Sequence, residues 1–142
     1  MFDVKSFVMV GQTALFETVV SEGDIAMNFG SRRLGRLLAT PSLVKFMIAA
    51  AVEAVDPQLP EGMVTIGTSM QYTHTAPSII GATVRVTATV MEINGNSITF
   101  NITASDELGE IGTGLHQRSV VVRDELVQRV HQRVASILKN HP

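Results

Sequence analysis

The sequence predicts an α+β fold in which a curved antiparallel sheet of about five strands wraps around one central buried helix. Three observations lead to this prediction: one helical segment is apolar on almost every side, four segments with strand-like alternation follow it, and an amphipathic segment ends the chain. With 142 residues and 45% hydrophobic content, the chain can bury a sizeable core, so we expect a single domain over residues 1–142.

Residues 38–55 form the expected central helix. Its only charged residues are Lys45 and Glu53, and a helix that is apolar all round must be surrounded by other parts of the protein. Thr40 is expected to cap the first turn, because Pro41 suits the first helical position, where no amide hydrogen is needed. The rest of the chain must therefore enclose this helix.

The flanking segments have the period of strands. Apolar and polar residues alternate from residue 83 to 90 and again from 97 to 105, and Asn94-Gly95 between them predicts a hairpin. Such alternation means that one face of an antiparallel sheet meets the core while the other meets water or a partner. The expected strands span residues 12–20, 63–73, 83–90, 97–105 and 110–122.

Residues 124–138 predict a C-terminal amphipathic helix that lies on the surface, with one apolar stripe and one charged side. Together these elements describe the hotdog architecture, a sheet rolled around a helix. The alternative is an open α+β sandwich, which would leave one side of the central helix in water.

Composition limits the function. With 11 basic and 13 acidic residues, the net charge of −2 gives no electrostatic reason to expect nucleic acid or a membrane as partner. The absence of cysteine excludes a disulfide, a thiolate nucleophile and a cysteine-bound metal. No phosphate-binding loop or metal-ligand spacing is found, so we expect no metal. The N-terminus lacks a secretion signal, and we expect a cytoplasmic protein.

His74 and Thr40 are the first candidates for chemistry. His74 ends its predicted strand and shares parity with Val64, Ile66, Met70 and Tyr72, so we expect these side chains on one face and the imidazole is a candidate general base; the alternative is a solvated histidine at a strand end. Thr40 could orient water or a carbonyl, although capping already explains it. The amides at the helix start could also polarise a carbonyl oxygen.

The last predicted strand contains a second group of candidates that share one face. Its two glycines would let a ligand or another backbone approach, and Arg118 could then bind a phosphate or carboxylate; a glycine-rich bend explains the pattern equally well. A basic cluster before the helix could meet phosphates, or could simply be an exposed loop. These residues are Gly112, Gly114, His116 and Arg118, and Arg32, Arg33 and Arg36.

Three stretches together resemble the fluoroacetyl-CoA thioesterase family of hotdog proteins. They are LLATPSLVKFMIAAAVEAV, VTIGTSMQYTHTAPSIIGATVRVTA and ITFNITASDELGEIGTGLHQRSVVV. The resemblance runs from about Gly30 to Val122, and its motifs occur in the family's order and spacing.

The resemblance implies hydrolysis of short acyl-CoA thioesters by a threonine at the helix start, a glutamate about two turns later and a histidine at the end of the next strand. Thr40 and His74 match the first and last of these. The glutamate's position holds Ile48, which can neither attack an acyl carbon nor transfer a proton. Asp24, Glu17 or a carboxylate of a partner subunit are the possible substitutes.

Two hypotheses follow. In the first, the protein is a thioesterase: His74 activates water, Thr40 positions it, the helix amides and Gly67 hold the oxyanion, and Arg118 or Arg36 holds coenzyme A, which is part of the substrate rather than a cofactor. In the second, it is a non-catalytic module that binds acyl-CoA or a small apolar ligand, because Ile48 makes the pocket wall apolar. In both cases exposed edge strands predict a homodimer, or a dimer of dimers, with sites at the subunit boundary.

Overall fold

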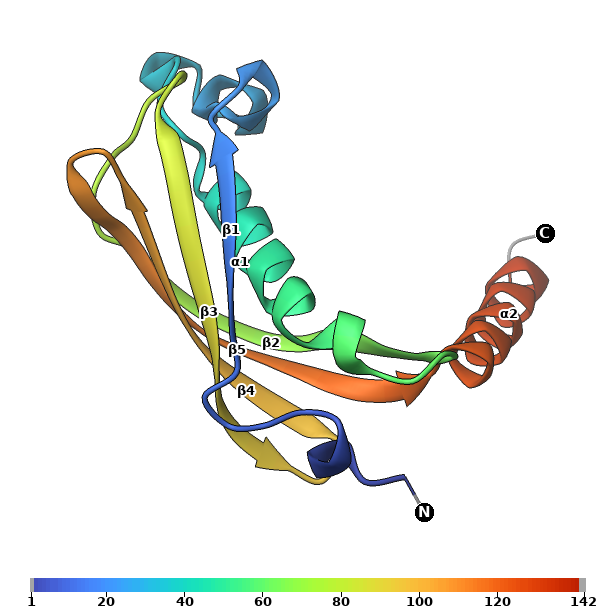
Figure 1. Ribbon diagram of the computed structural model, residues 1–142. Coiled ribbons are helices and arrows are strands. Elements are labelled where there is room, and N and C mark those ends of the chain that lie inside the picture. Colours follow the sequence, from blue (N-terminus) through green and yellow to red (C-terminus); the bar gives the residue numbers. More distant parts are fainter. Residues whose placement is uncertain (1, 141–142) are drawn as a thin grey trace.

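The computed structural model describes residues 2–140, and five antiparallel strands form one sheet in the order β1-β3-β4-β5-β2. The strands are β1 (Thr13–Val19), β2 (Met63–His74), β3 (Thr83–Asn94), β4 (Ser97–Asp106) and β5 (Gly109–Val122). The sheet curves around α1 (Thr40–Val55), which lies on its concave side, and α2 (Arg123–Lys139) follows β5 (Figure 1). This arrangement confirms the predicted architecture of a curved sheet on a central helix.

The remaining elements are short 3-10 helices. Three of them form the connection between β1 and α1, at one end of the sheet (Figure 1). They are η1 (Val4–Ser6), η2 (Glu22–Asp24), η3 (Ala26–Phe29), η4 (Arg32–Leu34) and η5 (Asp56–Gln58). No helix among residues 2–140 is both long and apolar enough to cross a membrane.

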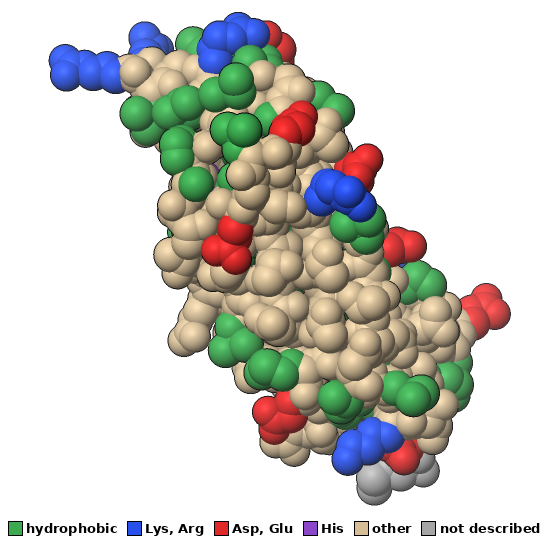
Figure 2. All heavy atoms as spheres, turned by 60° about the vertical axis from the view of Figure 1, so that its left-hand side comes forward, with side chains coloured by type: hydrophobic (Ala, Val, Ile, Leu, Met, Phe, Trp, Pro, Cys, Tyr) green, Lys and Arg blue, Asp and Glu red, His purple; other side chains and the backbone are tan. Residues whose placement is uncertain are grey.

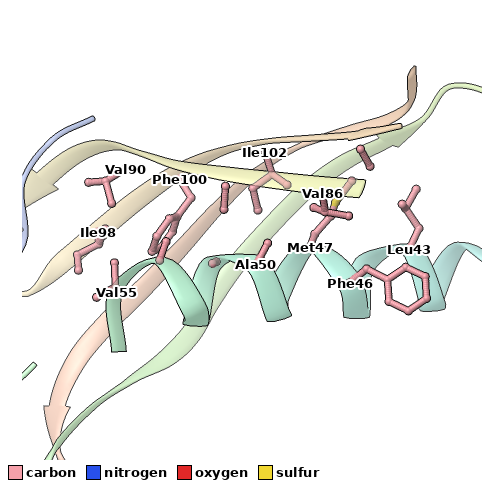
Figure 3. Close-up of a cluster of buried hydrophobic side chains, with 14 of the residues drawn as sticks. Leu43, Phe46, Met47, Ala50, Val55, Val86, Val90, Ile98, Phe100 and Ile102 are labelled. Atoms are coloured by element: carbon pink, nitrogen blue, oxygen red, sulfur yellow. The ribbon is translucent and has the colours of Figure 1, made fainter. Parts of the chain in front are cut away.

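The core lies between α1 and the concave face of the sheet (Figure 3). Fully buried Leu43 and Met47 of α1 approach β5 where Gly112 and Gly114 have no side chain. A Cβ on Gly112 would lie 2.8 Å from Leu43 Cδ2, and one on Gly114 would lie 3.0 Å from Met47 Sδ. The two glycines therefore admit the chain's own helix, and not a ligand.

One side of α1 is less enclosed than predicted. Val44, Ile48 and Val52 are half-buried, and they lie on one face because they are four residues apart. Lys45 and Glu53 are exposed. The expectation that α1 is buried on nearly every side is wrong for this face, since the sheet of one chain covers only the opposite face.

β2 is an edge strand with an irregularity in its middle. Its pairing with β5 shifts register between Gly67 and Ser69. Beyond the shift, Met70, Tyr72 and His74 pair with His116, Gly114 and Gly112 in that order, and these residues of β5 face the core. The expectation that the side chains of Val64 and Ile66 share a face with His74 is therefore wrong, because the bulge reverses the alternation.

Candidate active site

The start of α1 differs by one residue from the expectation. Ala39 is the N-cap and Thr40 is the first helical residue, with Pro41 second. The Thr40 side chain makes no capping hydrogen bond, so the expectation that it caps the first turn is wrong. Its hydroxyl is free to interact elsewhere.

That hydroxyl meets the imidazole of His74. Thr40 Oγ1 lies 2.9 Å from His74 Nδ1, within hydrogen-bond distance. His74 is the last residue of β2 and pairs with Gly112, over which Leu43 of α1 packs. The close packing of α1 on β5 therefore sets the distance between the helix start and the strand end.

His74 has the electrostatic properties of a neutral base. Burial lowers the pKa of its imidazole below 6.5, and the nearby backbone of Ala76 offsets part of this decrease. Nδ1 faces Thr40, while Nε2 is buried and has no hydrogen-bond partner among the described residues. Near neutral pH the ring is uncharged and can accept a proton.

Asp24 holds the start of α1 in place. Its carboxylate accepts hydrogen bonds from the backbone and hydroxyl of Ser21 and from Lys45 Nζ at 2.8 Å, and its carbonyl accepts from the amide of Ala39. Burial tends to raise the pKa of this carboxyl, but the hydrogen bonds from Lys45 and Ser21 lower it overall. Asp24 is therefore committed to structure, and no contact links its carboxylate to Thr40 or His74 in the described chain.

A pocket of about 330 Å³ opens at the Thr40–His74 pair. Its other walls come from the segment before α1 and from the turn after β2, and they are mostly apolar. The lining residues are Leu34, Leu37, Leu38, Thr40, His74, Thr75, Ala76 and Pro77. An apolar pocket with two convergent polar groups is the usual form of a small-molecule site.

Ile48 lies apart from this pocket. It is eight residues after Thr40, about 12 Å along the helix axis, on the half-buried face with Val44 and Val52. Glu17, the other carboxylate considered as a substitute, pairs with Arg85 at the opposite edge of the sheet. Among residues 2–140 no carboxylate lines the pocket beside His74.

Arg118 and His116 form a buried network and not a surface anion site. Arg118 donates to Thr65 Oγ1 at 2.7 Å and to Thr65 O at 2.9 Å, and its Nη1 lies 3.3 Å from His116 Nε2. His116 Nδ1 lies 2.7 Å from Ser69 O. Arg118 is only 7% exposed, so the structure argues against the predicted role of this residue in binding phosphate.

This network surrounds Gly67. A Cβ there would lie 3.3 Å from Arg118 Nη1. Arg118 bonds the carbonyl of Thr65 before the bulge, and His116 bonds the carbonyl of Ser69 after it. Gly67 is also seven residues before His74, about 23 Å along the strand, so its amide is not at the Thr40–His74 pair of the same chain. The buried network around Gly67 was not predicted from the sequence. The alternating pattern places Arg118 and His116 on the same strand face as the two glycines, but it does not show that their side chains are buried.

Arg36 is exposed and pairs with Glu22 at 3.2 Å. It belongs to the segment that leads into α1, near Leu34 and Leu37 of the pocket wall. Its side chain remains accessible to an anionic ligand, unlike that of Arg118.

The sheet, the central helix and the position of this pair define a hotdog protein of the thioesterase superfamily. A structure of a hot-dog-like protein from Thermanaerovibrio acidaminovorans superposes with a TM-score of 0.87 at 33% identity, over 93% of this chain and 97% of the other. A mutant of the fluoroacetyl-CoA thioesterase FlK, solved in complex with acetyl-CoA, gives a TM-score of 0.84 at 28% identity, over 89% and 98% of the two chains.

Sequence comparison agrees. The profile of the fluoroacetyl-CoA-specific thioesterase family matches residues 20–124. The fluoroacetyl-CoA thioesterase of Streptantibioticus cattleyicolor is 35% identical over 97 residues, which are 68% of this chain and 70% of that protein. The chain belongs to the fluoroacetyl-CoA-specific thioesterase family.

Proposed function

We propose that the protein hydrolyses an acyl-CoA thioester, with neutral His74 as general base and the Thr40 hydroxyl beside it. The observation that carries this proposal is the 2.9 Å contact between Thr40 Oγ1 and His74 Nδ1, at the mouth of an apolar pocket. Family membership supplies the reaction class. The pocket wall, which includes Leu34, Leu37 and Leu38, would select the acyl group.

The chemistry follows from the two atoms in contact. With its proton on Nε2, His74 accepts a hydrogen bond at Nδ1 from the Thr40 hydroxyl or from a water that Thr40 holds. As the water oxygen attacks the thioester carbonyl, Nδ1 takes its proton; the carbon–sulfur bond then breaks and the proton passes to the leaving sulfur. If the Thr40 oxygen attacks instead, an acyl-threonine forms as the thiol leaves, and a water deprotonated by His74 then hydrolyses this ester and restores the hydroxyl. Water and thioester give acid and thiol, so no other reactant is needed.

The oxyanion needs a hydrogen-bond donor near Thr40. At the start of α1, Pro41 has no amide hydrogen, and the amides of Ser42 and Leu43 donate to Ala39 O. The amide of Thr40 has no acceptor among the described residues and is the donor that we assign to this task.

The test measures thiol release from short and aromatic acyl-CoAs with a thiol reagent, which the cysteine-free chain does not consume. His74→Ala and Thr40→Ala should each lower kcat by a factor of about 10² to 10⁴. Thr103→Ala is the control, since Thr103 is exposed on β4. Turnover that is insensitive to both substitutions, or absent with every thioester, would contradict the proposal.

A second function is supported by Ile48. Without the family's glutamate, the same pocket could bind an acyl-CoA or another apolar ligand and not consume it. Calorimetric titration with an intact thioester, followed by recovery of that thioester, identifies such a binder. Ile48→Glu separates the two functions: it restores a carboxylate at the position where the family resemblance places one, and we expect hydrolysis to rise at least tenfold if the scaffold still aligns the thioester.

Two chains are proposed to act together as a homodimer. β2 is a twelve-residue edge strand, and an exposed edge of this length pairs readily with another strand. Beside it, the half-buried stripe of Val44, Ile48 and Val52 on α1 offers further apolar surface. An antiparallel pairing of β2 with its copy would extend the sheet and cover this stripe.

A further inference from the structure

The apolar stripe of α2 is unpartnered. Val127, Val130, Val134 and Ile137 are 37%, 48%, 47% and 48% exposed, and no residue of this helix is buried. Figure 1 shows α2 projecting from the end of the sheet. A 17-residue helix with several β-branched residues is only marginally stable in isolation, so α2 needs a contact that one chain does not provide.

The helix turns its polar side toward its own sheet. Glu125, Gln128, Arg129 and Gln132 line a groove of about 490 Å³ together with Phe2, Met63, Asn96 and residues 120–122 of β5. At about 100° per residue, these polar residues and the valine stripe lie on opposite sides of α2. An amphipathic helix that rests on its own domain has the reverse orientation, so the stripe is directed at a different molecule.

α2 begins beside the free edge of the sheet. The family profile ends at residue 124, where this helix begins. The amide of Arg123 donates to Gly62 O, and Val122 pairs with Met63, so α2 leaves the sheet beside the first residue of the free edge strand β2. Any molecule that pairs with this edge will lie next to α2.

A second unpartnered apolar surface lies beyond the other end of β2 and adjoins the pocket through Leu34. We call it the pocket rim, and it consists of Met27, Phe29, Leu34 and Ile79, which are 46%, 49%, 55% and 57% exposed. Figure 2 shows hydrophobic side chains beside Lys or Arg side chains at this end of the molecule, its upper end in the view. Arg32 and Arg33 of η4 lie next to Leu34 and form no ion pair among the described residues.

We propose that α2 of one protomer packs its valine stripe on the pocket rim of a second copy of this chain. The inference rests on the proposed pairing of β2 edges: an antiparallel pair over the full strand places Met63 of one chain opposite His74 of the other. Two strand spacings, about 10 Å, then separate β5 from the partner's β2, and a helix is about as wide. Each chain would thus help to enclose its partner's site.

Charge supports this occupant. Asp124 in the first turn of α2 is exposed and lies outside the groove, and the pocket rim carries Arg32 and Arg33. Opposite charges at the edge of an apolar contact fix its orientation. A membrane is the less suitable occupant, because helices that lie in the lipid interface commonly insert Trp or Phe, and residues 123–139 contain neither.

Cross-linking tests the inference, because the chain has no cysteine of its own. One chain carries Val130→Cys and the other carries Leu34→Cys or Ile79→Cys; the two are mixed and treated with a bifunctional maleimide. We expect a covalent heterodimer at several times the yield obtained with Gln128→Cys, the matched control on the groove side of α2. Light scattering of the unmodified chain should give twice the 15.3 kDa protomer mass.

Each alternative result is decisive. A monomeric mass would overturn both the β2 pairing and the α2 contact. A dimer without the cross-link would overturn the α2 contact but not the β2 pairing. Cross-linking of a Val134→Cys chain with itself, or α2-dependent binding to vesicles, would also overturn only the α2 contact. The cross-link does not require turnover, so an inactive protein that cross-links would contradict the thioesterase proposal and not this one.

Discussion

Thr40 shows how much depends on the exact place where a helix begins. From sequence, its hydroxyl was expected to cap the helix, and a capping hydroxyl is occupied. In the structure Ala39 takes the cap position, and the Thr40 hydroxyl lies beside His74. Helix boundaries are uncertain by one or two residues from sequence alone, and here that uncertainty separates a structural group from a candidate catalytic one.

The sequence correctly placed Thr40 at the helix start and His74 at the strand end, and their catalytic roles remain predictions. It could not place Gly67 or Arg118. A pattern of alternating residues tells which face a side chain occupies but not what already fills that face. Arg118 looked available because two glycines precede it on the same face, yet Thr65 and His116 hold its guanidinium.

The buried histidine beside Arg118 should make stability depend on pH. Burial lowers the pKa of His116, the carbonyl of Ser69 opposes this, and the charge of Arg118 lowers it further. The unfolded chain therefore takes up a proton first as pH falls through 6.5, and stability is lost from there down to the folded pKa, while above 6.5 it is fully present. His74, whose pKa is also lowered, acts in the same direction.

Urea denaturation from about pH 8 to about pH 5 measures this effect. His116→Gln retains a donor for Ser69 O and an acceptor for Arg118 without titrating, so its stability should fall less with acid than that of the unsubstituted chain. His131→Gln, at an exposed position in α2, is the control. Equal pH dependence in all three proteins would show that the network does not require a neutral imidazole.

At the scale of elements, the contact between α1 and β5 connects packing to the site. Gly112→Ala would place a Cβ 2.8 Å from Leu43 Cδ2 and 3.1 Å from the carbonyl oxygen of Thr73, the residue before His74. We expect a loss of about 1 to 3 kcal/mol in the free energy of unfolding, because a close-packed core must shift to admit the methyl group. The shift separates the helix start from the strand end, so hydrolysis should fall as well.

Gly23→Ala is the control for this substitution, since a Cβ there meets nothing within 4 Å. Urea titration gives the stability, and thiol release gives the activity. If Gly112→Ala unfolds at the same urea concentration as the control, the glycine is not needed for the approach of α1.

The order and type of the elements were predictable because each has a strong period of its own. Residues 83–90 and 97–105 alternate cleanly, and an Asn94-Gly95 turn joins the two strands. The bulge in β2 was not predictable, because nothing in that strand's composition marks where pairing with β5 slips by one residue. That slip moved Val64 and Ile66 to the face opposite His74.

At the scale of the whole molecule, the least predictable feature was the half-open side of α1. The sequence requires an apolar helix to be covered but does not say by which chain. Val44, Ile48 and Val52 on α1, the free edge of β2 and the stripe on α2 are all apolar or unpaired surfaces that one chain leaves uncovered. The proposed dimer would cover these surfaces, and the sequence patterns of one chain do not say which chain supplies the cover.

The exposure of α2 predicts how a chain outside the proposed dimer would be degraded. Arg123, Arg129, Arg133 and Lys139 lie on a helix that nothing buries, so an unassembled protomer offers trypsin-like proteases several cleavage points that open by local fraying. Cleavage there would leave the sheet and α1 whole, because α2 contributes no buried residue to them. Dilution below the dissociation constant of the proposed dimer should therefore increase proteolytic cleavage within α2. The abundance of the protein in a cell would then depend on dimer formation.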